Sequence, residues 1–197
     1  MLTGVILLYG IFDKRNEGYK GYLDFIVKEV HSSNFDRIIL CGGYTDPARP
    51  TISEALAAKQ YLEEISKFPN FVLEDKSINT NQNLEFAAQK LQSGEKTVVY
   101  CDLIRKAKVI WLALHYLIKL DPKTIYEQLL TFASQRDLYK EFSYQTLAVR
   151  GYDFKGRTKE EMIGQSYASI LNVVSLYDKE MEEMDIAQRK KDFGLKD

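Results

Sequence analysis

The stretch Arg37-Ile-Ile-Leu-Cys-Gly-Gly-Tyr-Thr-Asp-Pro-Ala-Arg-Pro-Thr-Ile-Ser-Glu-Ala55 decides the fold of this chain, together with Val72-Leu-Glu-Asp-Lys-Ser-Ile-Asn-Thr-Asn-Gln-Asn83. In each, an apolar strand ends in a loop of small, polar and acidic residues, and the loop opens a helix. Alternating strands and helices are typical of a parallel sheet covered by helices. In an open α/β sheet such loops lie at the carboxyl ends of the strands, where ligands bind.

The same alternation continues on both sides of this stretch. Strands are expected at residues 2–9, 36–41, 71–73 and 96–101. Helices are expected at residues 17–31, 52–67, about 80–92 and 104–119. The strands are continuous apolar runs, which mark strands buried on both faces. Residues 2–119 therefore predict an α/β fold with a doubly wound, mostly parallel sheet and helices on both faces.

Extra helices are expected after residue 119. Asp121-Pro122 is a helix start signal, Tyr144–Val149 alternates like a fifth strand, and Thr158–Glu161 is a capping box. The last helix carries one apolar stripe, made of Ile163, Tyr167, Ile170, Val174, Tyr177 and Met181. From Asp178 onward the dense charge predicts a chain that frays into solvent. We expect a single domain over residues 1–181, with its C-terminal helical extension, and a charged tail over 182–197.

Composition limits the classes of function. The net charge of −1 gives no general attraction to nucleic acid or to an anionic membrane. Residues 1–12 lack the basic leader and cleavage site of a secretory signal, and no apolar run is long enough for a membrane anchor. The two cysteines form no Cys-x-x-Cys motif, as in a reduced protein. These features predict a cytoplasmic protein.

The loop after the second strand offers the first candidate residues. Gly42 and Gly43 can bring backbone amides close to an anionic ligand, or can simply form a tight turn. Ser53 and Glu54 begin the next helix, where a carboxylate interacts well with the helix dipole. Glu54 is either an ordinary first-turn residue or a cleft residue that binds a hydroxyl, an amine or a metal. Neither a dinucleotide fingerprint nor a P-loop is present.

The loop after the third strand is the most informative one. Glu74 follows the strand directly, and Ser77, Asn79, Thr80 and Asn83 follow it. One helix cap needs one such residue, or two in a reciprocal arrangement. The remaining polar side chains favour a loop that binds a polar ligand.

A third loop follows the fourth strand. Asp102 is a cap or a site residue, and Arg105 is either solvated or holds a phosphate or carboxylate. Cys101 would need a neighbouring base to act as a nucleophile, and neither histidine lies in a candidate loop. His115 is expected to be a satisfied core histidine. No spacing of His, Cys, Asp and Glu suggests a metal site.

Two separated motifs, with a helix between them, resemble the YdcF/SanA/ElyC-like family, long catalogued as a bacterial domain of unknown function. The matching residues are Cys41, Gly42, Gly43, Ser53, Glu54 and Ala55, then Glu74, Ser77, Asn79, Thr80 and Asn83. The resemblance spans roughly residues 4–118. It implies a Rossmann-like fold with both motifs in one cleft.

The family also has ligand and envelope associations. One member is associated with binding S-adenosylmethionine, and membrane-anchored members with envelope integrity. The family's Gly-rich first loop is represented here by Gly10 alone, in Tyr9-Gly10-Ile11, and Cys41 stands where the family often has Ser. Ile104 stands where we would align the histidine of the family. The resemblance therefore implies no histidine base in this chain.

Three functional hypotheses follow. The first is a cytosolic protein, a transferase or hydrolase, that binds a small polar or nucleotide-like ligand, with S-adenosylmethionine as one candidate and Glu54 and Glu74 as the catalytic carboxylates. The second is a non-catalytic interaction or regulatory module, which could form an oligomer through the C-terminal helix. The third is an enzyme of cell-envelope precursor metabolism, implied by the resemblance alone.

Overall fold

The computed structural model describes residues 1–154 and 158–195 of the chain. Within them, one sheet has the strand order β3-β2-β1-β4-β6-β5, and every neighbouring pair is parallel except β5 with β6. The strands are β1 (Leu2–Leu7), β2 (Arg37–Cys41), β3 (Phe71–Glu74), β4 (Lys96–Asp102), β5 (Phe142–Tyr144) and β6 (Leu147–Tyr152). The order reverses between β1 and β4, and this switch point is where an α/β sheet offers a crevice.

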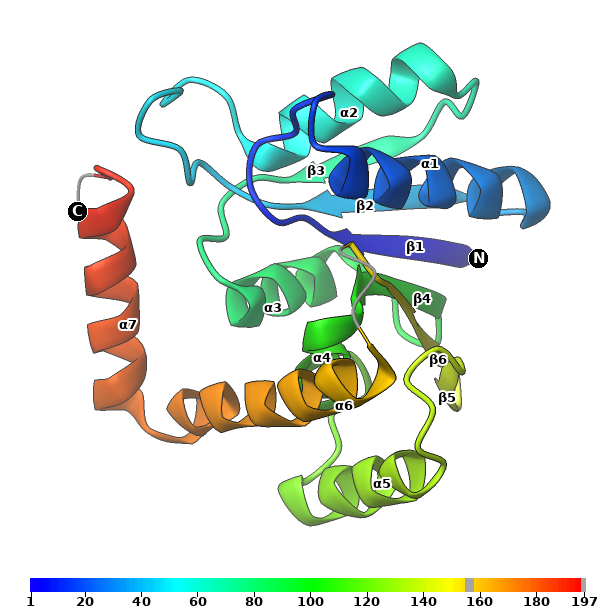
Figure 1. Cartoon of the computed structure of the whole chain (residues 1–197), viewed down its shortest axis with the longest axis vertical. Coiled ribbons are helices and arrows are strands. Elements are labelled where there is room, and N and C mark those ends of the chain that lie inside the picture. The colour runs from blue at the N-terminus through cyan, green and yellow to red at the C-terminus, as the bar shows by residue number, and fades with distance from the viewer. Residues whose placement is uncertain (155–157, 196–197) are drawn as a thin grey trace.

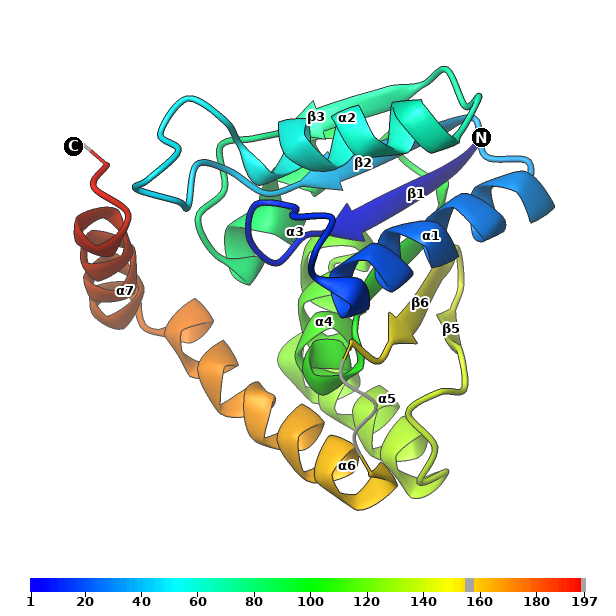
Figure 2. The same cartoon turned by 45° about the horizontal axis from the view of Figure 1, so that its top comes forward.

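Helices cover both faces of this sheet (Figures 1 and 2). They are α1 (Glu17–Ser32), α2 (Glu54–Ile65), α3 (Thr80–Lys90), α4 (Lys106–Ala113), α5 (Pro122–Ser134), α6 (Lys159–Ala168) and α7 (Lys179–Asp192). Helices α1 and α2 pack on one face, and α3, α4 and α5 belong to the core on the other face. The predicted doubly wound α/β fold is confirmed.

Side-chain alternation along the strands explains the continuous apolar runs. In β1, Val5 and Leu7 belong to the core under α3 and α4, whereas Ile6 points into the core under α1 and α2. All three side chains are completely buried. A central strand that is buried on both faces needs apolar residues at every position.

The fifth strand was predicted incorrectly. The alternating segment Tyr144–Val149 contains the turn of a β-hairpin, in which β5 pairs antiparallel with β6. Gln145 adopts a φ of 50° in this turn. Because the turn contains no Gly, Pro, Asn or Asp, its residue types gave no turn signal.

The buried helix predicted over 104–119 has three parts. It starts as a 3-10 turn over Leu103–Arg105, continues as α4, and ends as a π-helical turn over Leu114–Ile118. Lys119 then ends it with a φ of 64°. The predicted deep burial is confirmed, because every apolar residue of α4 except Trp111 is buried.

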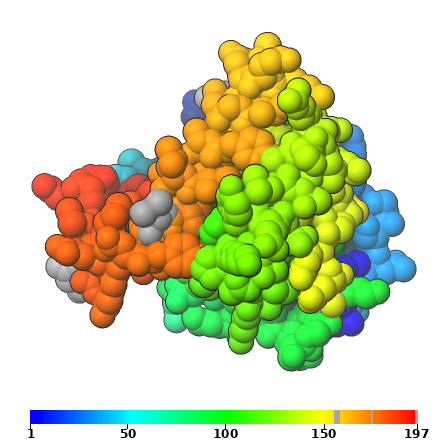
Figure 3. Space-filling model, turned by 90° about the horizontal axis from the view of Figure 1, so that it is seen from below, coloured from blue at the N-terminus to red at the C-terminus, as the bar shows by residue number. Residues whose placement is uncertain are grey.

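The predicted last helix is also broken. Helix α6 passes into a 3-10 segment over Ser169–Tyr177, and α7 follows at an angle (Figure 1). The predicted stripe therefore cannot lie on one helix face; the side chain of Val174 lies outside the described residues. Seen from below, the C-terminal segment projects beyond the rest of the molecule (Figure 3). No helix among the described residues is long and apolar enough to cross a membrane.

The expected fraying after Asp178 is wrong for Lys179–Asp192. Helix α7 is capped by the Asp178 side chain, has acidic residues in its first turn, and has basic residues in its last turn. This order of charges suits the helix dipole. Asp185 and Arg189 also form an ion pair one helical turn apart. The charges therefore stabilise a helix here, where their density alone had indicated disorder.

Candidate functional site

A cavity of about 880 Å³ lies at the carboxyl ends of the parallel strands. One wall, here called the sheet wall, comes from the loops after β1 to β4 and the first turns of the helices that follow. The other, the C-terminal wall, comes from residues 165–193. Nine of the predicted site residues line it: Gly10, Gly42, Gly43, Glu54, Ser77, Asn79, Thr80, Asn83 and Arg105. Residues of both sequence motifs thus line the same cavity.

Glu54 is a buried carboxylate in the sheet wall. It is 6% exposed, and its carboxylate accepts hydrogen bonds from the Thr45 hydroxyl and from the backbone of Gly10. Burial raises the pKa of Glu54 above its usual value, while these hydrogen bonds and the charge of Arg105 oppose the rise. A buried carboxyl with a raised pKa is suited to acid–base chemistry or to binding a ligand hydroxyl.

The paired glycines have a packing role. The amides of Gly42 and Gly43 donate to the carbonyl oxygens of Glu74 and Ser77, both at 2.9 Å, so they are not presented to an anion as the sequence suggested. A Cβ on Gly43 would lie 2.2 Å from the Ser77 carbonyl oxygen, and one on Gly42 would lie 2.7 Å from the Glu54 Cβ. Glycine is needed here because two loops touch through their backbones.

Glu74 faces its own loop and is not among the cavity-lining residues. One of its carboxylate oxygens accepts from the amides of Lys76 and Ser77 at 2.9 and 3.1 Å, and the other lies 2.6 Å from the Ser77 hydroxyl. Ser77 is also hydrogen-bonded to the Asn83 side chain. Burial raises the pKa of Glu74, and these hydrogen bonds oppose the rise. Glu74 was expected to be a catalytic carboxylate in the cleft, and the structure corrects this. Its carboxylate holds the conformation of the loop between β3 and α3, other residues of which line the cavity.

Three other predicted residues also lie outside the cavity lining. Ser53 caps α2 by accepting from the Leu56 amide at 3.1 Å. Asp102 caps the turn before α4. Cys101 is fully buried in the core, and burial raises the pKa of its thiol to about 12. A thiol in that state is a poor nucleophile, so Cys101 is a packing residue.

The loop after β4 contributes two cations to the cavity. The Arg105 guanidinium lies over the ring of Tyr9, 4.7 Å from its centroid, and the Tyr9 hydroxyl accepts from the Asp102 amide at 2.8 Å. Lys108 lines the cavity one helical turn further on. Arg105 was a candidate from the sequence, whereas Lys108 was not.

Sequence reasoning also missed Asn81. It lines the cavity in the first turn of α3, is 4% exposed, and its Oδ1 has no hydrogen-bond partner among the described residues. Burying an unpaired amide oxygen is costly. The excess of polar residues in this loop was the available signal, and burial singles out Asn81 among them.

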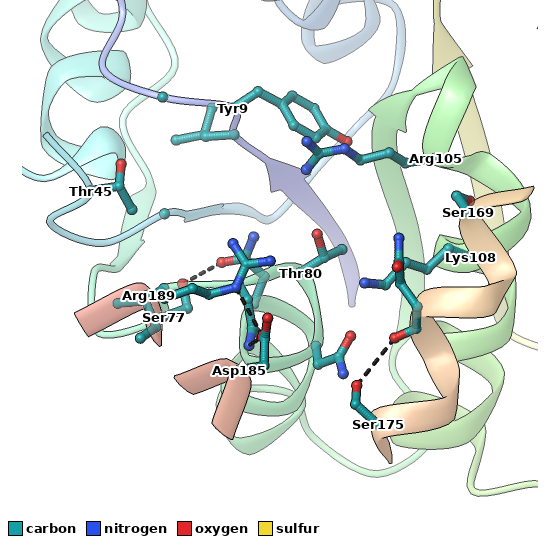
Figure 4. Close-up of a pocket in the computed structure, with 18 of the residues that line it drawn as sticks. Tyr9, Thr45, Ser77, Thr80, Arg105, Lys108, Ser169, Ser175, Asp185 and Arg189 are labelled. Carbon is teal, nitrogen blue, oxygen red and sulfur yellow. Dashed lines mark hydrogen bonds and ion pairs between the residues drawn. The ribbon is translucent and has the colours of Figure 1, made fainter. Parts of the chain in front are cut away.

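The site predicted from the sequence contained no residue of the C-terminal wall. Met181, Asp185, Arg189 and Phe193 all line the cavity, from a segment that was expected to fray. Asn79, which caps α3, donates from its Nδ2 to Asp185 at 3.2 Å. This contact joins α7 to the start of α3. Figure 4 shows Asp185 and Arg189 near Thr80 of that turn.

His115 is not the satisfied core histidine that was expected. Its ring lies against Tyr116 and Tyr177, and its Nδ1 is buried without a hydrogen-bond partner among the described residues. Burial lowers the pKa of His115. The residue does not line the cavity.

Comparisons with protein-family models, with curated proteins and with solved structures found no match to this chain. The resemblance to the YdcF-like family therefore stays a prediction from its motifs. What the site does must be argued from its geometry.

Proposed function

We propose that the chain is a cytoplasmic protein that binds a small polar, nucleotide-like metabolite in this cavity and acts on it as a transferase or hydrolase. In this proposal Glu54 is the acid–base or hydroxyl-binding carboxylate. S-adenosylmethionine remains one candidate ligand. Glu74 maintains the loop between β3 and α3.

One observation carries the proposal: the unpaired Asn81 Oδ1, buried in the lining of the same cavity as Glu54. Nearly all buried polar side-chain atoms have a hydrogen-bond partner, and an exception needs an explanation. A ligand hydroxyl or amino group would supply the missing donor. Glu54 adds a second acceptor of the kind that polar metabolites require, because its buried carboxyl lines the same cavity.

Thermal unfolding with a ligand panel tests this function. The panel contains nucleotides, S-adenosylmethionine and sugar phosphates, each titrated to saturation. A ligand at 100 times its Kd should stabilise the wild type by about 2.7 kcal/mol. Asn81→Ala and Glu54→Gln should lower the affinity for that ligand, whereas Asn34→Ala, at an exposed residue outside the cavity, should leave it unchanged. A panel in which no compound gives a saturable shift would remove this proposal.

A second candidate, the interaction module, is favoured by exposed apolar side chains on the C-terminal segment. Leu171 and Met184 are 75% and 66% exposed. A second copy or a partner protein could cover them. Analytical ultracentrifugation of Met184→Ser, at a residue outside the cavity lining, beside the wild type separates the two candidates: a dimer lost in the variant favours the module, and a monomer in both favours ligand binding.

A further inference from the structure

The cavity gathers positive charge from both walls. Arg105 and Lys108 come from the sheet wall and Arg189 from α7. Figure 4 shows Lys108 and Arg189 on opposite sides of Thr80, with Arg105 beside Tyr9. Among the described residues, no carboxylate lies within ion-pair distance of Arg105 or Lys108. Arg189 is paired with Asp185 at 2.9 Å. Glu54 is the second carboxylate among the described lining residues, so three cations face two carboxylates and the lining has an excess of one positive charge.

Lys108 lies among these charges. Its pKa is lowered to about 8, first by burial and then by the charges of Arg105 and Arg189, while Asp185 partly opposes the effect. Arg105 from the same wall and Arg189 from α7 thus both repel the Lys108 charge. A ligand anion placed among them would relieve the repulsion.

The start of α3 adds a further attraction for an anion. Asn79, Thr80 and Asn81 all line the cavity. The first amides of a helix have no partner within the helix, and its dipole favours negative charge there. The cap at Asn79 satisfies the amide of Gln82 only. The buried, unpaired Asn81 side chain lies in this same turn and independently indicates a ligand.

We propose that the ligand is a phosphate ester of a small hydroxyl-bearing molecule, with its phosphate between the first turn of α3, Lys108 and Arg189. Its hydroxyl groups contact Glu54 and Asn81. This assignment rests on the proposed function and names the chemical class of its ligand. It also makes α7 part of the binding site, because α7 supplies Arg189.

A phosphate fits better than a single carboxylate. Arginine binds phosphate through paired donors, and lysine binds it as a point charge. A dianion can engage cations from two walls at once, which suits charges placed on opposite sides of the cavity. The same charges are unfavourable for the cationic sulfonium group of S-adenosylmethionine. The charges of the cavity thus favour a phosphorylated metabolite over S-adenosylmethionine, two ligand classes between which the sequence did not decide.

Matched ligand pairs test the phosphate directly. Isothermal titration would compare glucose with glucose 6-phosphate, ribose with ribose 5-phosphate, and adenosine with adenosine monophosphate, at constant ionic strength. We expect saturable binding of a phosphorylated member and at least tenfold weaker binding of its unphosphorylated partner. The pairs also distinguish a sugar phosphate from a nucleotide. Equal affinity within every pair would overturn the assignment.

Variants locate the phosphate. Arg189→Gln and Lys108→Gln should each weaken the phosphorylated ligand at least tenfold, and neither should affect the unphosphorylated partner. Lys191→Gln removes the same charge from an exposed position of α7 outside the cavity and should bind like the wild type. Unchanged affinity in both Arg189→Gln and Lys108→Gln would overturn the assignment. Thermal unfolding without ligand shows which variants are folded.

The outcomes separate this inference from the proposed function. If an unphosphorylated compound binds in a manner that depends on Glu54 and Asn81, the phosphate assignment fails and the proposed function survives. If no member of any pair binds, the phosphate assignment also fails. The proposed function then fails only if S-adenosylmethionine and every other compound of the wider panel leave the melting temperature unchanged.

Discussion

The two walls of the cavity are built in opposite ways. The sheet wall is buried and fixed by short contacts between loops, as where the Gly43 amide donates to the Ser77 carbonyl oxygen. The C-terminal wall ends in α7, a helix with no buried residue. Asn79 and Asp185 form a polar link between them. The residues that shape the site are thus part of the folded core. Helix α7 adds Arg189 to the site without adding buried residues.

This difference has consequences for stability. Elements with few buried contacts open locally at low free energy, while buried core strands and helices open only with the whole domain. Substitutions that disturb the backbone contacts between the loops of the sheet wall should therefore destabilise the protein, whereas substitutions of α7 side chains that line the cavity should mainly change binding.

Gly43→Ala should have the largest effect. The new Cβ would lie 2.2 Å from a backbone oxygen, and a backbone neighbour cannot rotate away as a side chain can. We expect a loss of about 1–3 kcal/mol in the free energy of unfolding, measured by urea denaturation.

Gly164→Ala in α6 is the matched control, because a Cβ there meets no atom within 4 Å. Alanine is the better helix former, so this variant should gain about 0.5–1 kcal/mol. Equal losses in both variants would contradict the distinction between the walls.

Glu54→Gln, in the sheet wall, should change stability and ligand affinity in opposite directions. Burial raises the folded-state pKa of Glu54 above its usual 4.5. In the pH window between 4.5 and the raised value, the folded state binds a proton that the unfolded state has lost, so the stability from this group falls as pH rises. Glutamine keeps an acceptor for Thr45 and removes the charge.

The melting temperature of Glu54→Gln at pH 7 should therefore exceed that of the wild type, while ligand affinity falls. Differential scanning calorimetry from pH 4 to pH 8 measures this. The gain should shrink as the pH falls through 4.5 to 4, because the wild-type carboxyl then becomes protonated in the unfolded state as well as in the folded state. A variant less stable at pH 7 than the wild type would contradict this, because the hydrogen bonds and the charge of Arg105 would then outweigh the effect of burial on the ionised carboxylate.

The smallest expected effect is the low free energy of local opening of α7, compared with that of α3. Native-state hydrogen exchange should show amides of α7 exchanging well before those of α3, because α3 has five buried residues and α7 has none. Saturation with the bound phosphorylated compound should slow exchange in α7 more than in α3. Equal protection of both helices in the free protein would indicate that α7 is as firmly held as the sheet wall.

Much of the sheet wall could be predicted from sequence. Apolar runs placed β1 to β4, and polar strand ends placed Glu54 and Asn79, since periodicity and strand-end chemistry are local signals. Whether a side chain faces its own loop is not local. The roles of Glu74 and Ser53 depend on which backbone amides come within reach once the loop has folded. Burial of Cys101 among core residues likewise needed the tertiary structure.

The C-terminal wall could not be predicted for a different reason. Its charge density suggested solvation, and only its sequence order, with acids first and bases last, favours a helix. The contact of Asp185 with Asn79 joins residues 106 positions apart. No local sequence pattern encodes such a pairing, so Arg189 could not be predicted as a site residue.

Two lysines with the same depressed pKa provide the most direct test of the phosphate site. Lys108 lies in the cavity, whereas Lys106 is buried outside it, with Nζ donating to the carbonyl oxygens of Leu138 and Lys140. The pKa of each is lowered to about 8. NMR titration of isotope-labelled lysine side chains, assigned with Lys108→Gln and Lys106→Met, would follow both with and without inorganic pyrophosphate. Our account predicts that pyrophosphate raises the pKa of Lys108 towards its usual 10.5 and leaves Lys106 near 8. An unchanged Lys108, or an equal rise in both lysines, would contradict it.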